Sequence, residues 1–185
     1  TGLVMDLRFE NQLEILHRYQ AAIGDWAFEI YGGYVFVNFD ASIEEQNTHI
    51  DNVIRSLSKS KGRLCVILRG KEPKREQVVA FLRSAAERTK AAGIELVIFP
   101  HIGNVYIIES AEEALPYVEE VGSDNLFISL HLSHEIMAGN GARLNEVAAN
   151  IKKWIRLPSI NGADVDAMHE TQGWARGIMP LTKGD

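Results

Sequence analysis

Short apolar segments alternate with single amphipathic helices along most of this chain, and this order constrains the fold more than any other feature. Residues 63–69, 94–99 and 125–130 are strand-like runs, and residues 73–92 and 110–121 between them have the apolar spacing of helices. Strands that are apolar on both faces and separated by one helix pair in parallel through right-handed crossovers. The sequence therefore predicts an α/β domain built on a parallel sheet.

The same order extends towards both ends of the chain. We expect three more helices, at residues 6–22, 42–58 and 145–154. The second of these opens with Ser42 and has Glu45 three residues later, which is the capping-box spacing. Residues 26–39 read either as one strand with a bulge at Gly32 and Gly33 or as two short strands. Two short strands are expected near the C-terminal end, at residues 158–161 and 177–181.

About six to seven strands in one domain, residues 1–185, fit either a doubly wound sheet or an eight-stranded barrel. Doubly wound nucleotide folds usually carry a glycine fingerprint after the first strand, and this sequence has neither that motif nor a Walker loop. The absence favours a TIM-type (β/α)8 barrel. A whole barrel of this type has ~250 residues, so we expect a chain of 185 residues to hold an incomplete one.

Charge and composition exclude several classes of partner. The formal net charge of -6 and the scattered basic residues argue against a nucleic-acid-binding face. The sequence shows no transmembrane-length apolar run and no signal peptide, so no membrane partner is expected. Cys65, the only cysteine, is expected to be a small buried hydrophobe. We expect a cytoplasmic protein by default, although a chain that starts at Thr1 reads as a fragment and leaves a lost N-terminal signal open.

Three histidines close two consecutive apolar strands. His101 follows the strand at residues 94–99, and His131 and His134 follow the strand at 125–130. In parallel α/β enzymes the chemistry gathers at the carboxyl ends of the strands. The three imidazoles therefore indicate an active site and suggest a metal site, while the plainer alternative is that they cap buried strands.

Four segments of the C-terminal half resemble a known family. Residues 93–101, 128–134, 159–164 and 178–185 resemble, in order and spacing, the fifth to eighth strands of the xylose-isomerase-like TIM barrels, the sugar phosphate isomerases and epimerases related to the endonuclease IV fold. The resemblance covers residues 26–185. It implies a barrel that lacks its first strand and last helix, and a substrate that is a small carbohydrate.

The family's usual metal site is largely replaced in this sequence. Phe99 and Pro100 stand where the resemblance implies a fifth-strand Glu, and His131 stands at the sixth-strand acidic position. Asn161 replaces a seventh-strand His. Only two positions match the family pattern, His134 and Asp164. The site that remains is rich in nitrogen donors, which suits Zn or Co better than Mg.

We expect His134 and Asp164 to be catalytic, and His131, His134 and Asp164 to hold one divalent ion (Zn, Mn or Co) if a cofactor is bound at all. His131 and His134 can converge only if the backbone turns between them, because positions three apart on a continuing strand point to opposite faces. The expected substrate-binding residues are Arg69, Lys71, His101, Asn161 and Lys183. The alternatives are that Lys71 solvates a loop and that Asn161 stabilises a turn. Trp174 is the best tryptophan candidate for stacking on a sugar.

The leading hypothesis is a sugar phosphate isomerase or epimerase that transfers a proton next to a carbonyl, with or without a metal. Such chemistry needs a base for the C–H proton and an electrophile for the enediolate oxygen. The alternative is a non-catalytic barrel that binds a sugar or another small ligand after losing its metal carboxylates. A DNA-repair endonuclease shares the fold, but the acidic chain offers no basic groove. Association into a homo-oligomer is left open.

Overall fold

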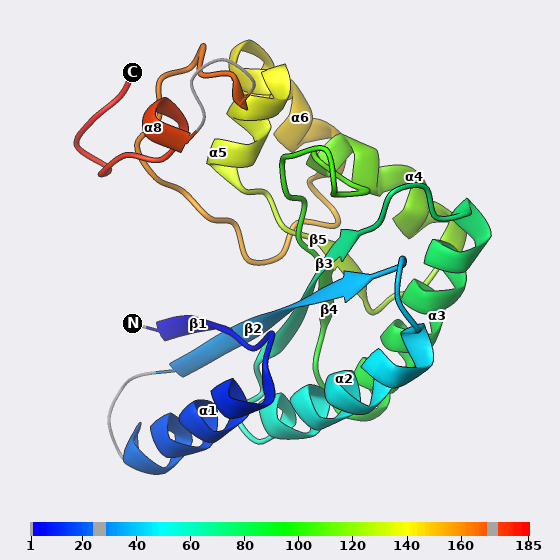
Figure 1. Cartoon of the computed structure of the whole chain (residues 1–185). Helices are drawn as coiled ribbons and strands as arrows, with labels where there is room; N and C mark the ends of the chain where they lie inside the picture. The colour runs from blue at the N-terminus through cyan, green and yellow to red at the C-terminus, as the bar shows by residue number, and fades with distance from the viewer. Residues whose placement is uncertain (1, 24–28, 170–173) are drawn as a thin grey trace.

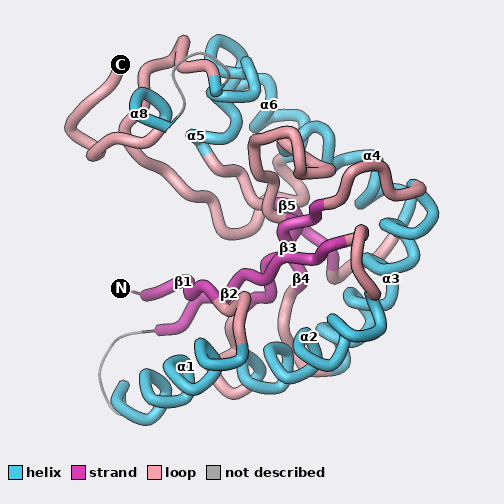
Figure 2. Tube along the Cα trace, in the orientation of Figure 1, coloured by secondary structure: helices cyan, strands magenta, loops and turns pink. Residues whose placement is uncertain are grey.

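The computed structural model describes residues 2–23, 29–169 and 174–185 of the chain. Strands and helices alternate through the first two thirds, and short helices and loops follow (Figure 2). The strands are β1 Gly2–Asp6, β2 Glu29–Asn38, β3 Arg63–Arg69, β4 Leu96–Ile98 and β5 Leu126–Ile128. The α-helices are α1 Glu10–Ile23, α2 Ile43–Ser58, α3 Arg75–Ala91, α4 Ala111–Val121, α5 Leu132–Glu135, α6 Leu144–Ile151 and α8 Trp174–Gly177. A π-helix, η1 Ile136–Asn140, and a 3-10 helix, η2 Gly141–Arg143, connect α5 to α6.

The five strands form one sheet in the order β1-β2-β3-β4-β5, and every neighbouring pair is parallel. This confirms the α/β class and the parallel pairing that the sequence predicted. Strand β2 is a single strand, whose register against β1 shifts between Leu3 and Val4, so the reading with one irregular strand is correct. The part of that expected strand at residues 26–28 lies outside the described residues.

Helices α1 to α4 cover one side of the sheet (Figure 1). Alternate side chains of the strands, such as Val35, Val66 and Ile98, pack with the apolar stripes of these helices into one core. Burial of this apolar surface is the main force that stabilises the fold. At the start of α2 the Oγ atom of Ser42 accepts a hydrogen bond from the backbone N–H of Glu45 at 3.3 Å, which confirms the predicted N-terminal cap.

The ends of the sheet differ from the sequence prediction. Residues 2–6, which were not predicted as a strand, form β1, and α1 therefore begins at Glu10 rather than at Asp6. Counted back from β4 as the fifth strand of the resemblance, β1 takes the second position of the barrel. The sequence prediction missed β1 because five residues before a helix carry too little periodicity to identify a strand.

The two strands predicted near the C-terminal end are not strands in the structure. Residues 158–161 contribute one parallel bridge, from Ser159 to His131, and residues 177–181 contribute one antiparallel bridge, from Met179 to Gly162. The last segment crosses Gly162 so closely that a Cβ atom there would stand 2.1 Å from the carbonyl oxygen of Pro180. A glycine is required at this crossing, and the antiparallel contact does not continue the parallel sheet.

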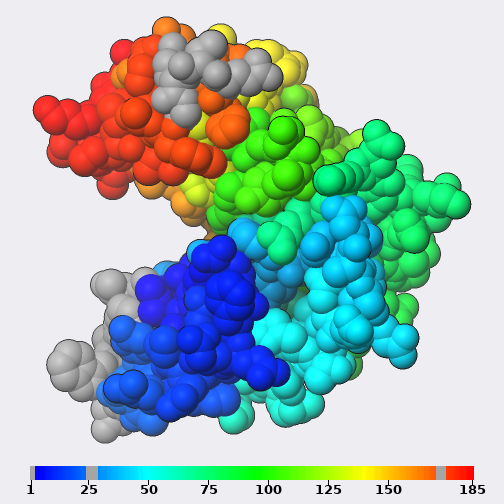
Figure 3. All heavy atoms as spheres, viewed as in Figure 1, coloured from blue at the N-terminus to red at the C-terminus, as the bar shows by residue number. Residues whose placement is uncertain are grey.

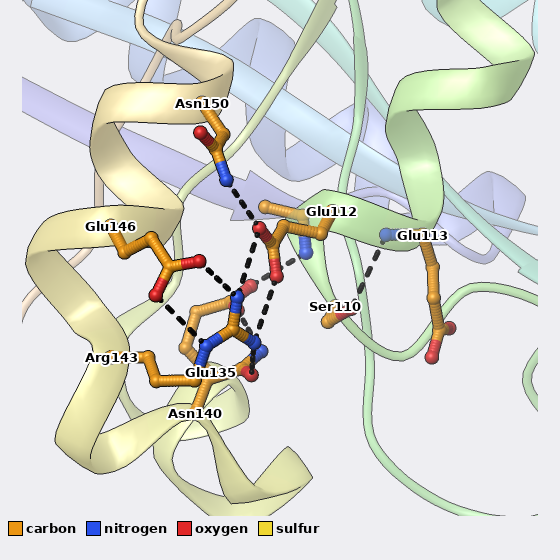
Figure 4. A network of polar contacts seen from close by, with 9 residues as sticks. Ser110, Glu112, Glu113, Glu135, Asn140, Arg143, Glu146 and Asn150 are labelled. Carbon is orange, nitrogen blue, oxygen red and sulfur yellow. Dashed lines mark hydrogen bonds and ion pairs between the residues drawn. The ribbon is translucent and has the colours of Figure 1, made fainter.

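A buried carboxylate joins α5 to the start of α4. Glu135 is fully buried; its Oε1 accepts a hydrogen bond from the backbone N–H of Ala111 at 2.6 Å, and its Oε2 accepts one from Asn140 at 2.9 Å (Figure 4). Burial raises the pKa of Glu135, and the two hydrogen bonds oppose that rise. Around this buried centre, Arg143 pairs with Glu112 and Glu146 at the surface. The network connects α4, α5 and α6.

Replacing Glu135 with Ala should lower the free energy of unfolding by about 1–3 kcal/mol, because the buried N–H of Ala111 would lose its acceptor. The matched control is Glu146→Ala in the same network, where the side chain is exposed and pairs with Arg143. Glu146→Ala should change the free energy of unfolding by no more than about 0.5 kcal/mol. Urea denaturation of the two variants measures both effects, and equal losses would contradict a special role for the buried carboxylate.

Candidate active site

A cavity of about 500 Å³ lies at the carboxyl ends of the strands. It occupies the hollow between the N-terminal and C-terminal parts of the chain (Figure 3). Its wall is formed by Arg8, Tyr34, Phe36, Ile67, Phe99, His101, Tyr106, His131, His134, Trp174 and Ile178. Volumes of roughly 300–1,000 Å³ are typical of small-molecule sites. The cavity is therefore the candidate active site.

The structure brings the three predicted histidines together in this cavity. The ring centroid of His134 lies 4.3 Å from that of His101 and 4.3 Å from that of His131. After His131 the chain turns into α5, so His131 stands at the N-terminal cap position and His134 lies within the first turn. This turn removes the strand geometry that would have pointed the two side chains to opposite faces. His134 is buried, with 3% of its surface exposed.

The backbone of Ile102 determines which ring nitrogen carries the proton in His101 and in His134. The N–H of Ile102 donates to Nδ1 of His134 at 3.1 Å, and the carbonyl oxygen of Ile102 lies 3.2 Å from Nδ1 of His101. An amide N–H can only donate, so Nδ1 of His134 is unprotonated and Nε2 carries the proton in the neutral ring. A carbonyl oxygen can only accept, so Nδ1 of His101 carries the proton and Nε2 has a free electron pair.

Burial keeps these imidazoles neutral. It lowers the pKa of His131 from 6.5 to about 4, and the neighbouring His101 adds to the effect. Burial also lowers the pKa of His134 far below its usual value, with further contributions from His131 and His101. The pKa of His101 is lowered by burial as well, although its hydrogen bond to Ile102 acts in the opposite direction. At neutral pH the cluster therefore holds hydrogen-bonding groups without net charge.

The arrangement does not fit the metal site that the resemblance implied. A metal-bound imidazole offers the electron pair of one nitrogen and usually donates from the other. In His134, Nδ1 is occupied by the N–H of Ile102 and Nε2 carries the proton. Within residues 2–23, 29–169 and 174–185, no three His, Cys, Asp or Glu side chains form a group that could hold a metal ion. We therefore assign no step to a metal.

Asp164 and Lys183, two of the predicted site residues, lie away from the histidines. Asp164 pairs with Arg176 at 2.5 Å and is not part of the cavity wall. Lys183 is exposed near the end of the chain, where its backbone N–H donates to the carbonyl oxygen of Pro180. The roles of Asp164 and Lys183 remain predictions.

Two further predicted binding residues take part in local structure. The backbone N–H of Lys71 donates to the carboxylate of Asp40, and the residue is exposed in the loop after β3. The side-chain amide of Asn161 donates to the carbonyl oxygens of Gly162 and Gly177, at 2.6 and 2.9 Å. Asn161 thus joins the segment after α6 to the last segment of the chain.

Arg69 lies beside the main cavity and has an unused donor. Its guanidinium carbon stands 5.2 Å from the ring centroid of Phe36, and that of Arg8 stands 4.9 Å from the same centroid. Arg8 pairs with Asp6, whereas the buried Nε of Arg69 has no hydrogen-bond partner among the described residues. Arg69, Arg8 and Phe36 also line a second cavity, of about 370 Å³. Through Arg8 and Phe36 the two cavities adjoin.

The sequence analysis missed an aromatic wall of the site. Tyr34 and Phe36 alternate along β2 and face the cavity, and the ring of Tyr106 lies 4.2 Å from that of His101. A period of two on β2 was a usable signal for the first two residues. Trp174, the predicted stacking candidate, does reach the site, with ring centroids 5.3 Å from His134 and 5.7 Å from His101.

Comparisons with known proteins show similarity in fold. No protein-family model and no curated protein matches the chain. D-allulose 3-epimerase from Methylomonas sp. superposes with a TM-score of 0.68 and 16% identity, over 86% of this chain and 61% of that one. A xylose isomerase domain-containing protein from Salmonella typhimurium gives 0.67 and 17%, over 93% and 66%. The IolI protein, solved with a zinc atom, gives 0.69 and 13%, over 87% and 63%.

The chain thus spans about three fifths of the length of the D-allulose 3-epimerase. At these identities the likeness is one of fold, and it agrees with the five parallel strands found among the described residues, where a closed barrel has eight. The predicted architecture is confirmed. The chain has the fold of the xylose-isomerase-like TIM barrels, in incomplete form.

Proposed function

We propose that this chain is a sugar isomerase or epimerase-like enzyme that moves a proton next to the carbonyl of a small polyhydroxylated substrate. The observation that carries the proposal is the cluster of three neutral histidines in a cavity at the carboxyl ends of the strands. Neutral imidazoles can both accept and donate protons near neutral pH. Sugar epimerases are also among the solved structures of this fold, which supports the substrate class.

The cavity has the two kinds of surface that a sugar needs. Aromatic rings, among them Trp174 and Phe36, offer apolar faces for the C–H groups, and Tyr34 and Tyr106 carry hydroxyl groups. The three imidazoles gather on one side, where ring contacts with Phe99 and Trp174 hold them in place. A ketose bound here would have its reacting carbon beside groups that can exchange a proton.

The alternative is a ligand-binding barrel without turnover. It is favoured by Phe99 and Pro100 at the position where the resemblance implied a carboxylate, and by the pairing of Asp164 with Arg176. Both hypotheses predict sugar binding. Only the enzyme hypothesis predicts exchange of a carbon-bound proton with solvent.

Incubation with D-allulose and L-ribulose in heavy water tests the two hypotheses. We expect deuterium to replace the proton on a carbon next to the carbonyl, as measured by NMR, at a rate well above that without protein. The control is His17→Gln, which changes a histidine that bonds Ser56 on the helical side, outside the cavity. Binding of the ketoses without exchange would support the alternative, and neither binding nor exchange would contradict both.

Arg69 is proposed to bind an anionic group of the substrate, since its buried donor has no partner. If so, Arg69→Met should raise KM for a ketose phosphate at least about 10-fold, the effect of losing a charge-assisted hydrogen bond, and should change KM for the unphosphorylated ketose little. Lys71→Met is the matched comparison, because Lys71 is exposed in the adjoining loop. A larger effect at Lys71 would move the anion site to that loop.

The buried histidines also predict how stability depends on pH. Between pH 6.5 and about 4 the unfolded chain binds a proton at His131 that the folded chain does not bind, so the free energy of unfolding falls as the pH falls through this range. We expect His131 to lower the free energy of unfolding by about 1–3 kcal/mol over this pH range. Urea denaturation at pH 7 and pH 4 should show a smaller loss in His131→Asn than in the original chain or in His17→Gln. Equal losses in all three would contradict the assignment.

A further inference from the structure

We propose that His101 and His134 form a metal-free proton-transfer pair with opposite roles. Nε2 of His101 is the base that removes the proton next to the carbonyl, and the Nε2–H of His134 is the donor that stabilises the carbonyl oxygen. Ile102 is the positioning residue for both rings. This inference rests on the proposed function and assigns the roles within it.

The base is His101 because its electron pair is free. Nδ1 donates to the carbonyl oxygen of Ile102, which leaves Nε2 as the acceptor. Its ring lies in contact with Tyr106 and His134 at the cavity wall. No hydrogen bond between described residues uses Nε2 of His101. The acceptor is therefore available to a substrate.

The donor is His134 because its other nitrogen is already occupied. The N–H of Ile102 holds Nδ1 at 3.1 Å, so the proton of the neutral ring sits on Nε2. Burial and two adjacent imidazoles keep this ring neutral. A neutral imidazole that donates a hydrogen bond is a suitable electrophile for an enediolate, because it can stabilise the developing negative charge without first losing a proton.

The proton balance closes without a further reactant. The C–H bond next to the carbonyl breaks, its proton goes to Nε2 of His101, and its electron pair forms the C=C bond of an enediolate. The carbonyl oxygen takes up the negative charge and accepts a hydrogen bond from Nε2 of His134. Isomerisation follows when His101 returns the proton to the former carbonyl carbon, while the hydroxyl proton of the adjacent carbon passes to the former carbonyl oxygen by way of Nε2 of His134. Epimerisation follows when water protonates the opposite face of the same carbon and the protonated His101 gives its proton back to solvent.

The adjacent centroids of the two rings, 4.3 Å apart, suit these roles. The base and the donor must reach two neighbouring atoms of one substrate, a carbon and an oxygen. Both rings line the same cavity, and Trp174, from the short helix α8, contacts both of them. A ligand in this cavity would lie against both imidazoles in a largely aromatic environment, where hydrogen bonds are strengthened.

Nitrogen-15 NMR of the histidine rings tests the assignment without any substrate. At pH 7 we expect His101 to carry its proton on Nδ1 and His134 to carry its proton on Nε2, with the signals assigned from the spectra of His101→Gln and His134→Gln. Addition of Zn²⁺ alone should leave the His134 pattern unchanged. A protonated Nδ1 in His134, or loss of its Nε2 proton on adding Zn²⁺, would overturn the proposal.

Two substitutions at one position separate hydrogen bonding from metal binding. In His134→Gln the side-chain oxygen can accept from the N–H of Ile102 while the amide N–H donates, so proton exchange with D-allulose should fall less than about 10-fold. His134→Leu removes both functions and should cost about 10²–10³-fold. His101→Gln offers no base and should cost about 10²–10⁴-fold. Equal loss in His134→Gln and His134→Leu, or exchange that a chelator abolishes, would overturn the proposal.

The NMR measurement tests the roles of the two histidines, and the exchange measurement tests the proposed function, so each can fail without the other. If no ketose exchanges a proton but the ring tautomers are as stated, the proposed function is wrong while the assigned donor and acceptor of the pair stand. If exchange occurs and the tautomers are reversed, the function stands and the roles assigned to His101 and His134 are wrong.

Discussion

The parallel register of the five strands is the constraint on which the rest of the molecule depends. It places every carboxyl end on the same edge of the sheet, so residues at the end of β3 and just after β1, β4 and β5 meet although they lie far apart in sequence. Arg8, Arg69, His101 and His131 all reach that edge in this way. Antiparallel pairing would have sent alternate strand ends to opposite sides, and the cavity would not form.

The short helix α5 converts this edge into a defined site. Its two consecutive residues His134 and Glu135 are buried, and each accepts a hydrogen bond from a backbone N–H, one in the connection after β4 and one at the first residue of α4. His134 bonds to Ile102 and Glu135 bonds to Ala111. Buried polar groups are stable only when they have partners, so these two bonds hold α5 in one position against the connection. The bond from Ile102 that helps to stabilise α5 also sets the proton position of His134.

The sequence predicted the regular strands and helices in the middle of the chain. It missed the structure that depends on contacts between distant segments. Strands β3, β4 and β5 were recognised as short apolar runs, which are buried or partly buried on both faces in the structure. Helices α2, α3 and α4 were recognised from the helical spacing of the apolar residues that they bury in the core. Strand β1 was missed because it offers only three consecutive apolar residues, at positions 3–5, and the crossing at Gly162 arises from a tertiary contact with Pro180 that no local pattern encodes.

The sequence predicted the histidines of the candidate site but not most of the other residues that line it. His101, His131 and His134 were found because they close two consecutive apolar strands, at the edge where parallel α/β enzymes place their chemistry, and the structure does bring them together. Arg8 and Tyr106 were missed because one follows the unrecognised β1 and the other lies in an irregular loop. The proton positions could not be predicted at all, since they depend on Ile102, whose apolar side chain carries no signal of what its backbone does.

The surroundings of the histidines explain why neutral imidazoles suit this cavity better than charged groups. An isolated carboxylate among Phe36, Phe99 and Trp174 would lose its hydration without gaining a partner, and that cost is large in a medium of low dielectric constant. A neutral imidazole has a much smaller desolvation cost and still offers one donor and one acceptor. His131, at the position where the resemblance implied an acidic residue, is therefore consistent with an aromatic wall. In His101 and His134 the positions of the donor and the acceptor are then set by hydrogen bonds with the backbone of Ile102.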